Sequence, residues 1–497
     1  MTKKLLCILL CLMLECAAFS ACSAGKTNNN NQSAPKIQTT APIETDSSGL
    51  KLSFTKSDSL DPFESKTLNN QVLQTLVFES LFILDESFNA VPQLASGYAY
   101  ESSTELNVMI PSGLKFSNGD SLDADDVIYS FNRAASSPHW RKSLSCFSYV
   151  QRLSDNTVSF HMNYENPFAH NLLTFAIASS KTTDDGYPIG SGRYVFEEGD
   201  GMTFLTPNEN KEGFNPHIIK ITLVNIPSEE SIENAINIGN ISFAFRDLSS
   251  GSKTKMQCAK KAVTLSNFVF LGINTKRVGL SNEHLRRAIS LAVDRDTLVK
   301  SAYRGYGKSA VSLFFPGSAA AKQTASFAQS ADTAAAQQEI EKSKAENMTF
   351  TLLTNKNEER LSAAMLIKQQ LEAVGFKIKI IKTNTSLYRQ FVKSGNYDLY
   401  IGEIKLTKDM SLRPFFNKNG VAATGIEPDE CASRKAYNSF MRSKTELGRF
   451  MLTFTEEMPF VPLLYRQGML CYSRSMRGDM QGYGDNCFAN IEDWYFN

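Results

Sequence analysis

Four aspartates lie within seven residues of one another: Asp120, Asp123, Asp125 and Asp126. An acidic cluster of this density can bind calcium, carry out acid–base chemistry or begin a helix. An EF-hand loop needs a glycine between its acidic ligands and a glutamate at its twelfth position. Here Gly119 precedes the acids and no glutamate closes such a loop. The segment therefore does not favour a calcium site.

The spacing of these carboxylates instead predicts the start of a helix. Ser117–Asp120 reads Ser-Asn-Gly-Asp, a combination typical of turns. Asp123 then stands just before an apolar run with helical spacing, where an aspartate can cap the first backbone N–H groups. Asp126, three residues later, completes a pattern similar to a capping box. The negative charge of Asp125 would also interact favourably with the positive end of the helix dipole. The sequence predicts a turn followed by a capped helix.

No other segment carries a strong signal for catalysis. The five histidines are isolated and have no metal-ligand spacing, and no nucleophile elbow, zinc-protease pair or phosphate-binding loop occurs. The cysteines beyond the leader are Cys146, Cys258, Cys431, Cys471 and Cys487. They form no CxxC motif, and only Cys471 with Cys487 is a candidate disulfide pair. We predict no catalytic residue, metal or cofactor; a secreted hydrolase is the least favoured alternative.

Composition indicates a soluble globular protein. The chain has 497 residues, of which 42% are apolar and 21% charged, and its formal net charge is +1. A length near 500 residues corresponds to roughly three domains. Because the net charge is so small, no basic field would attract nucleic acid.

The N-terminus is predicted to be a lipoprotein leader. Lys3 and Lys4 precede the ten-residue apolar run Leu5–Leu14, which is shorter than the roughly 20 residues that cross a bilayer. FSAC then resembles a lipobox, with Phe19 in place of the usual leucine, and makes Cys22 the lipidated residue. Residues 1–21 are the predicted signal peptide; a plain secretory signal is the alternative.

A polar tether follows the leader. Residues 22–48 are rich in Asn, Ser and Thr and poor in apolar groups, so they are predicted to be disordered. A flexible chain of this length has a mean reach of about 28 Å. The predicted arrangement is a globular body held close to a membrane surface.

The later chain alternates between strand and helix patterns. Strands are predicted at 348–355, 376–383 and 397–404, with helices at 358–374 and 386–395 between them. Such alternation predicts βαβ units and a parallel sheet. A further helix is predicted within 281–305, whereas the alanine-rich segment 317–340 fits either a loose helix or a surface loop.

Several motifs, in order, resemble one protein family. They are LDPF (60–63), VFESLF (77–82), the long run from AVPQLASGY to VIYSFNR (90–133), PIGSGRYVF (188–196), FVFLGINTK (268–276), LRRAISLAVDRDTLV (285–299) and MPFVPLLY (458–465). Together they resemble the extracellular solute-binding proteins of ABC importers, in the peptide- and nickel-binding class. The resemblance covers residues 50–497, with Arg193 in place of a usual proline.

This resemblance implies a two-lobed α/β fold of the periplasmic-binding-protein type, in which hinge strands join the lobes and ligand lies between them. The implied domains are lobe one at 49–273 with an inserted subdomain near 64–185, lobe two at 274–465, and a return to lobe one at 466–497. The implied hinges are Ile273–Thr275 and Leu463–Gln467.

The expected ligand contacts are Asn274, Tyr306, Glu403, Lys405, Asp409, Arg413 and Tyr465. Asn274 ends a strand at the implied crossing, and its family counterpart contacts ligand; a turn asparagine is the alternative. Alternation places Glu403 and Lys405 on one face near a strand end, where α/β folds bind ligands, although an exposed ion pair would show the same pattern. The two tyrosines fit an amphipathic pocket or a core equally well.

The expected ligand is a peptide or a peptide-like molecule. Peptide-binding members usually carry a tryptophan and an aspartate that binds the peptide amino terminus. The segment GEIKLTKDMSLRPFF lacks the tryptophan, and Asp409 matches the aspartate only after a shift of register. Nickel-type members use histidine or a metal chelate, and residues 300–497 contain no histidine.

The predicted function is a monomeric, lipid-anchored receptor that delivers its solute to an ABC permease and ATPase. Its predicted location is the extracellular face of the cell membrane, or the periplasm if the source has an outer membrane. A surface sensing or signalling lipoprotein with the same fold is the alternative.

We expect Cys22→Ser to move the protein from the membrane fraction to the soluble fraction, because a serine cannot accept the thioether-linked lipid. Fractionation and immunoblotting of cells expressing either form measure this change. Unchanged fractionation would show that Cys22 is not the anchor.

Overall fold

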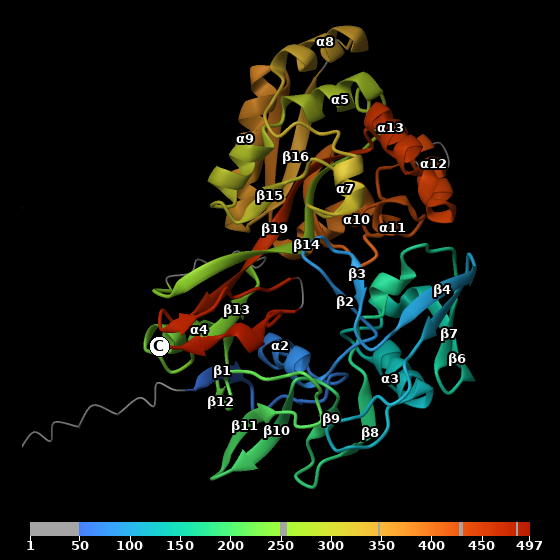
Figure 1. The fold of residues 1–497 in the computed structure, drawn as a ribbon. Helices are drawn as coiled ribbons and strands as arrows, with labels where there is room; N and C mark the ends of the chain where they lie inside the picture. Colours follow the sequence, from blue (N-terminus) through green and yellow to red (C-terminus); the bar gives the residue numbers. More distant parts are fainter. Residues whose placement is uncertain (1–48, 249–255, 346–347, 427–430, 484–485) are drawn as a thin grey trace, which may run out of the picture. The chain divides into compact units, whose positions relative to one another are not determined.

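The computed structural model describes residues 49–248, 256–345, 348–426, 431–483 and 486–497. The predicted signal peptide, Cys22 and the tether lie outside the described residues. Helices and strands of the described chain are arranged around one large mixed sheet (Figure 1).

The large sheet contains eleven strands. In spatial order they are β10 (Tyr194–Gly199), β11 (Met202–Pro207), β12 (Ile221–Asn225), β1 (Leu50–Phe54), β13 (Phe243–Arg246), β19 (Phe460–Tyr472), β14 (Ala259–Ile273), β18 (Leu399–Lys405), β16 (Thr349–Asn355) and β17 (Lys377–Thr383), with β15 (Gly307–Ser309) paired to β19.

The long strands β14 and β19 join the two lobes. They pair antiparallel along most of their length, with a register shift between Thr264 and Phe268 (Figure 1). Before the shift, β19 pairs with β13; after it, β14 pairs with β18. We call the β13 side, up to Thr264 and from Gln467 onward, lobe one, and the residues from Phe268 to Tyr465 lobe two.

The two expected hinges lie at different points on the crossing strands, and both remain predictions. The strand pairing changes sides at Thr264–Phe268, whereas Ile273–Thr275 lies at the lobe-two end of β14. The second expected hinge, Leu463–Gln467, spans the corresponding step in β19. A bulge or similar irregularity locally increases strand twist, so this step can change the direction of the sheet.

Lobe two contains the βαβ units predicted from the sequence. β16 pairs in parallel with both β17 and β18. The connecting helices are α9 (Glu358–Ala373) and α10 (Thr385–Ser394), each begun by an asparagine whose side chain accepts a backbone N–H. The pairing thus confirms the predicted parallel arrangement.

Two other helix predictions are refined by the structure. The helix predicted within 281–305 is α5 (Glu283–Ala292), which stops because Asp294 caps a new short turn at Arg295–Thr297. The ambiguous alanine-rich segment contains α7 (Ala319–Gln323) and the start of α8 (Thr333–Ser343).

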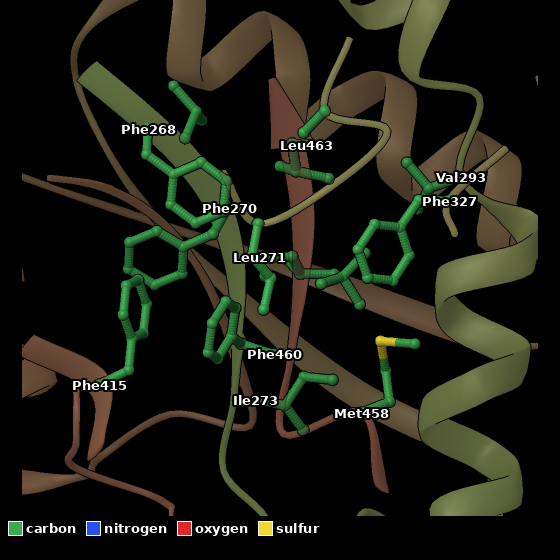
Figure 2. Packing of buried hydrophobic residues seen from close by; sticks show 14 of the residues in the cluster. Phe268, Phe270, Leu271, Ile273, Val293, Phe327, Phe415, Met458, Phe460 and Leu463 are labelled. Carbon is green, nitrogen blue, oxygen red and sulfur yellow. The ribbon is translucent and has the colours of Figure 1, made fainter. Parts of the chain in front are cut away.

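The core of lobe two is aromatic. Phe268 and Phe270 of β14 face Phe415 and Phe460, and all four rings are buried (Figure 2). The rings of Phe415 and Phe460 stack at 4.0 Å, and that of Phe270 meets Phe415 edge-on at 4.7 Å. Burial of each ring stabilises the lobe by roughly 2–3 kcal/mol, so the crossing strand is firmly anchored on this side.

Lobe one has its own core and carries an inserted four-stranded sheet. This sheet has the order β4 (Gly97–Ser102), β5 (Glu105–Met109), β7 (Thr157–Met162), β6 (Phe147–Ser154), and α3 (Ala124–Ser136) packs against it. Other lobe-one elements include α2 (Leu68–Val77), β2 (Phe82–Leu84), β3 (Ala90–Pro92), β8 (Ala178–Thr182), β9 (Pro188–Gly190), α4 (Glu229–Asn237), β20 (Met476–Arg477) and β21 (Tyr495–Phe496). Between β5 and α3, an isolated bridge joins Lys115 to Ser121.

The four clustered aspartates begin α3, as predicted. Asp123 accepts a hydrogen bond from the Asp125 backbone N–H at 2.8 Å, and the Asp126 carboxylate accepts one from the Asp123 N–H at 3.0 Å, which completes a capping box. Asp120 pairs with Lys181 at the surface. Across the described residues, no group of three or more histidine, cysteine or acidic side chains is arranged to hold a metal.

The candidate disulfide between Cys471 and Cys487 is not formed, and Cys471 is a free thiol. Cys471 packs in one buried cluster, whereas Cys487 packs with Leu470 in another. Because successive residues of a strand face opposite sides of the sheet, Leu470 and Cys471 point apart, and the sheet separates the two cysteines.

We expect Asp123→Ala to lower the free energy of unfolding by about 1 kcal/mol, because two backbone donors of α3 lose their acceptors. Asp120→Ala is the matched control: it removes a surface ion pair with Lys181 and an exposed hydrogen bond from the Asn118 amide, and it should change stability much less. Urea unfolding of the three proteins measures the difference. Equal effects of the two substitutions would contradict a structural role for the cap.

Candidate ligand-binding site

Segment 406–412, which follows β18, contacts lobe one. Asn166 donates from its amide to the Asp409 carboxylate at 2.8 Å. Asn171 donates to the Lys408 carbonyl at 3.2 Å, and Lys408 donates to the Thr174 hydroxyl at 2.6 Å. These three hydrogen bonds join the inserted part of lobe one to the end of a lobe-two strand. We call this surface the lobe joint.

Asp409 is the unusual charge of the lobe joint. Its side chain is buried and accepts hydrogen bonds from Asn166, the Thr407 hydroxyl and the Ser411 backbone N–H. Within the described part of the chain, no lysine or arginine forms an ion pair with it. Burial raises the pKa of the carboxyl, and the three hydrogen bonds oppose this shift only in part. The joint therefore contains a carboxylate without a countercharge.

Cations of lobe two lie over aromatic rings of lobe one around this carboxylate. The Arg413 guanidinium is 3.4 Å from the centre of the Tyr164 ring. Lys408 lies 5.1 Å from the Trp140 ring, and Lys444 lies 4.6 Å from the Phe168 ring. Contacts of this type are worth about 0.5–2 kcal/mol and are strongest away from water. They place cations of lobe two against aromatic rings of lobe one.

A second polar cluster lies at the crossing of β19. The buried Arg466 guanidinium is 2.8 Å from Glu359 at the start of α9 and 3.7 Å from Glu403 of β18. Glu403 also pairs with Arg360 at 3.1 Å and accepts from the Asn267 amide at 3.0 Å. Two arginines and two glutamates thus form a charge-balanced network, which we call the crossing network.

The crossing network also reaches lobe one. Arg466 donates to the carbonyl of Leu248 and lies 4.9 Å from the ring of Tyr303. The Arg466 Nε, the Tyr303 hydroxyl and the Asn267 Oδ1 are buried without a hydrogen-bond partner among the described residues. Burial of the Glu359 carboxylate raises its pKa, although Arg466 opposes the shift.

The structure separates the residues expected to contact ligand. Asp409 and Arg413 share the lobe joint, whereas Glu403 belongs to the crossing network. Lys405 is exposed. Asn274 lies at the far end of β14, where its amide donates to the carbonyls of Gly395 and Tyr397 at 3.1 Å each, as a turn asparagine would.

The two expected tyrosines occupy different environments. Tyr465 is fully buried in the lobe-two core and donates its hydroxyl to the Leu313 carbonyl at 2.6 Å. Tyr306 is half-buried and packs against a lobe-one cluster near the crossing. Neither tyrosine is placed at the lobe joint.

Sequence reasoning did not identify the partners of these charges. Asn166 and Tyr164 stand in a loop with no motif, and they meet Asp409 and Arg413 across more than two hundred residues of chain. The sequence does indicate the importance of Arg466, because this residue is the single charge in the apolar run FVPLLYRQGMLCY of β19. A charge inside a buried strand indicates a buried partner.

Two α/β lobes, a pair of strands crossing between them and buried polar groups where the lobes meet are typical of two-lobed solute-binding proteins. Among the described helices, none has the length and apolar character needed to cross a membrane.

Comparison with family models identifies the class more narrowly. Residues 89–420 match the model of the bacterial extracellular solute-binding proteins, family 5, and the chain belongs to this family. The resemblance noted in the sequence and the two-lobed α/β fold expected from it are both confirmed.

Relatives are similar along nearly the whole chain. The oligopeptide-binding protein AppA of Bacillus subtilis is 24% identical over 552 aligned positions, covering 99% of each chain. The structure of the periplasmic murein-tripeptide-binding protein MppA, in an unliganded open form, matches with a TM-score of 0.73 at 17% identity, covering 90% of this chain and 97% of that one. The structure of B. subtilis AppA with a nonapeptide matches with a TM-score of 0.56 at 20% identity, covering 90% and 99%. All of these relatives are named as binding proteins.

We expect Arg466→Ala to destabilise the protein by about 3–5 kcal/mol, because it leaves Glu359 and Glu403 buried with too little positive charge. Lys405→Ala, which removes an exposed cation from the strand that carries Glu403, is the control and should have a far smaller effect. Thermal and urea unfolding at neutral pH measure both. A loss no greater than that of the control would show that the crossing network does not stabilise the fold.

Proposed function

We propose that this protein binds an oligopeptide or a peptide-like solute between its lobes, and that Asp409 binds the ligand's ammonium group. The observation that carries the proposal is the buried, uncompensated carboxylate at the lobe joint. An ionised carboxylate in such a site is costly unless a cation accompanies it. A peptide amino terminus supplies one positive charge and three N–H donors, which suits the acceptor capacity of a carboxylate.

The geometry of the joint supports binding coupled to lobe closure. Asn166 gives Asp409 a neutral hydrogen bond, whereas an ammonium would give a charge-assisted bond of roughly twice the strength. A ligand could therefore replace the amide at Asp409 when the joint opens, and cations over Tyr164 and Phe168 would reassemble around it on closing. We place the hinge of this motion at Thr264–Phe268 and in the facing part of β19.

The names of the relatives support the same class of ligand. B. subtilis AppA is an oligopeptide-binding protein, and MppA binds a murein tripeptide. We extend peptide binding to this chain together with delivery to an ABC permease and ATPase. Anchoring through Cys22 and the tether 22–48, a location at the outer face of the cell membrane and a monomeric state complete the proposal. The domain boundaries follow the lobes defined above, with an inserted subdomain in lobe one.

We expect a mixed peptide library to raise the melting temperature of the wild-type protein, because ligand binds only the folded state. For each peptide that binds, N-terminal acetylation should weaken binding at least about tenfold, the loss of one charge-assisted bond. Asp409→Asn should weaken binding of the free peptide and remove most of the effect of acetylation. Isothermal titration calorimetry measures all four combinations.

Asp398→Asn is the matched control, because Asp398 is a carboxylate of the same lobe that accepts from Thr351 away from the joint. This variant should retain the discrimination against acetylated peptides. Affinity should also fall as the pH is lowered, beginning above the ordinary aspartate pKa of 3.8, because burial raises the pKa of Asp409 and the protonated form cannot pair with an ammonium. Equal binding of free and acetylated peptides would reject the role of Asp409, and absence of any peptide binding would reject the peptide ligand.

A further inference from the structure

Two free cysteines lie at the lobe-one end of the crossing strands. Cys258 immediately precedes β14, and Cys471 is the penultimate residue of β19. In the antiparallel ladder, Lys260 is paired with Cys471. Because side chains alternate along a strand, Cys258 projects on the same side as Lys260 and is the diagonal neighbour of Cys471.

The two thiols share one apolar environment. Cys471 is fully buried in the small cluster that also holds Met469 and Ile236, and Cys258 packs against this cluster from its edge. The thiols are hydrogen-bonded to each other. Cys258 stands outside the paired part of β14, so the strand ladder does not fix its backbone.

The environment gives the two thiols different reactivities. Cys258 is half-buried, and the hydrogen bond from Cys471 lowers its pKa, with a further contribution from Lys260. The same hydrogen bond, together with burial, raises the pKa of Cys471. Cys258 is therefore the accessible nucleophile, and Cys471 is the protected thiol beside it.

We propose that Cys258 and Cys471 form a reversible disulfide, made by exchange with a low-molecular-weight disulfide such as glutathione disulfide. The Cys258 thiolate attacks one sulfur of the small disulfide, breaks its S–S bond and releases one thiolate. Cys471 then loses its proton and attacks the Cys258 sulfur, which releases the second thiolate. The released thiolates take up the two protein protons, so the protein dithiol is oxidised by two electrons and one small disulfide is reduced to two thiols.

The disulfide would act on the strands that connect the lobes. The chain between Cys258 and Cys471 contains the whole of lobe two. The disulfide would therefore link, within lobe one, the two segments that lead into and out of lobe two. A cross-link over so long a loop restricts the unfolded chain strongly. It would also hold β14 and β19 together on the lobe-one side of the crossing while leaving the lobe-two side unconstrained.

Peptide mapping tests the proposal on the full-length chain. The protein is equilibrated with glutathione and glutathione disulfide at several ratios near pH 7.5, quenched with an alkylating reagent and digested with trypsin. Cleavage releases Met256–Lys260 and Gln467–Arg474 as separate peptides. We expect these two to become linked as the fraction of disulfide rises and to separate again on reduction, and the oxidised protein to melt roughly 3 °C or more above the reduced one.

Two variants provide the controls. In Cys471→Ala, glutathione should accumulate on Cys258, because no thiol remains to displace it. Cys431→Ala, which removes a buried thiol of lobe two, should leave the linked peptides unchanged. The proposal is overturned if Cys258 and Cys471 are alkylated separately at every ratio, if wild-type Cys258 retains glutathione without forming the linked peptide, or if Cys471→Ala acquires no adduct.

Discussion

The antiparallel pairing of β14 with β19 is the interaction on which the rest of the structure depends. Each strand belongs to both lobes, so the same ladder supports the β13 side and the β18 side of the sheet. The irregular register at Thr264–Phe268 divides the ladder and allows the two halves of the sheet to twist independently. Beyond this step, the stacked aromatic rings of lobe two fix one half, and the apolar cluster around Met469 and Cys471 fixes the other.

Two buried charge sites near this ladder are organised in opposite ways. In the crossing network, Arg466 and Arg360 balance Glu359 and Glu403, so the charges stabilise one another without help from outside the chain. At the lobe joint, the donors to Asp409 among the described residues are neutral, and nearby cations lie over aromatic rings. A carboxylate kept in this state is unfavourable for stability but suited to an incoming cation. The difference explains why Glu403, although near Asp409 in sequence, is the weaker candidate for ligand contact.

Local patterns predicted local structure well. Spacing within a few residues predicted the capping box at Asp123 and Asp126 and the strand–helix–strand units from Thr349 to Lys405. The family motifs predicted the two-lobed fold. The site was harder to predict because its contacts are long-range. Nothing near Asp409 in the sequence identifies Asn166 as its partner, and the crossing position depends on a register shift that hydrophobic alternation does not encode. The predicted disulfide between Cys471 and Cys487 was wrong for a related reason. Proximity in the sequence does not determine which face of a sheet each residue occupies.

The contacts along β14 and β19 indicate where lobe motion can be absorbed. At the lobe-two end, Asn274 ties the chain to Gly395 and Tyr397, and the adjoining strand is embedded in aromatic packing. At the lobe-one end, Cys258 and Cys471 lie together in an apolar cluster. Between them, Arg466 contacts both lobes through a side chain whose Nε has no hydrogen-bond partner among the described residues. We expect rotation about the crossing to rearrange this guanidinium and its carboxylates while both ends of the ladder remain packed. The crossing network would set the energetic cost of opening, and the carboxylate at the lobe joint would determine which ligand favours closure.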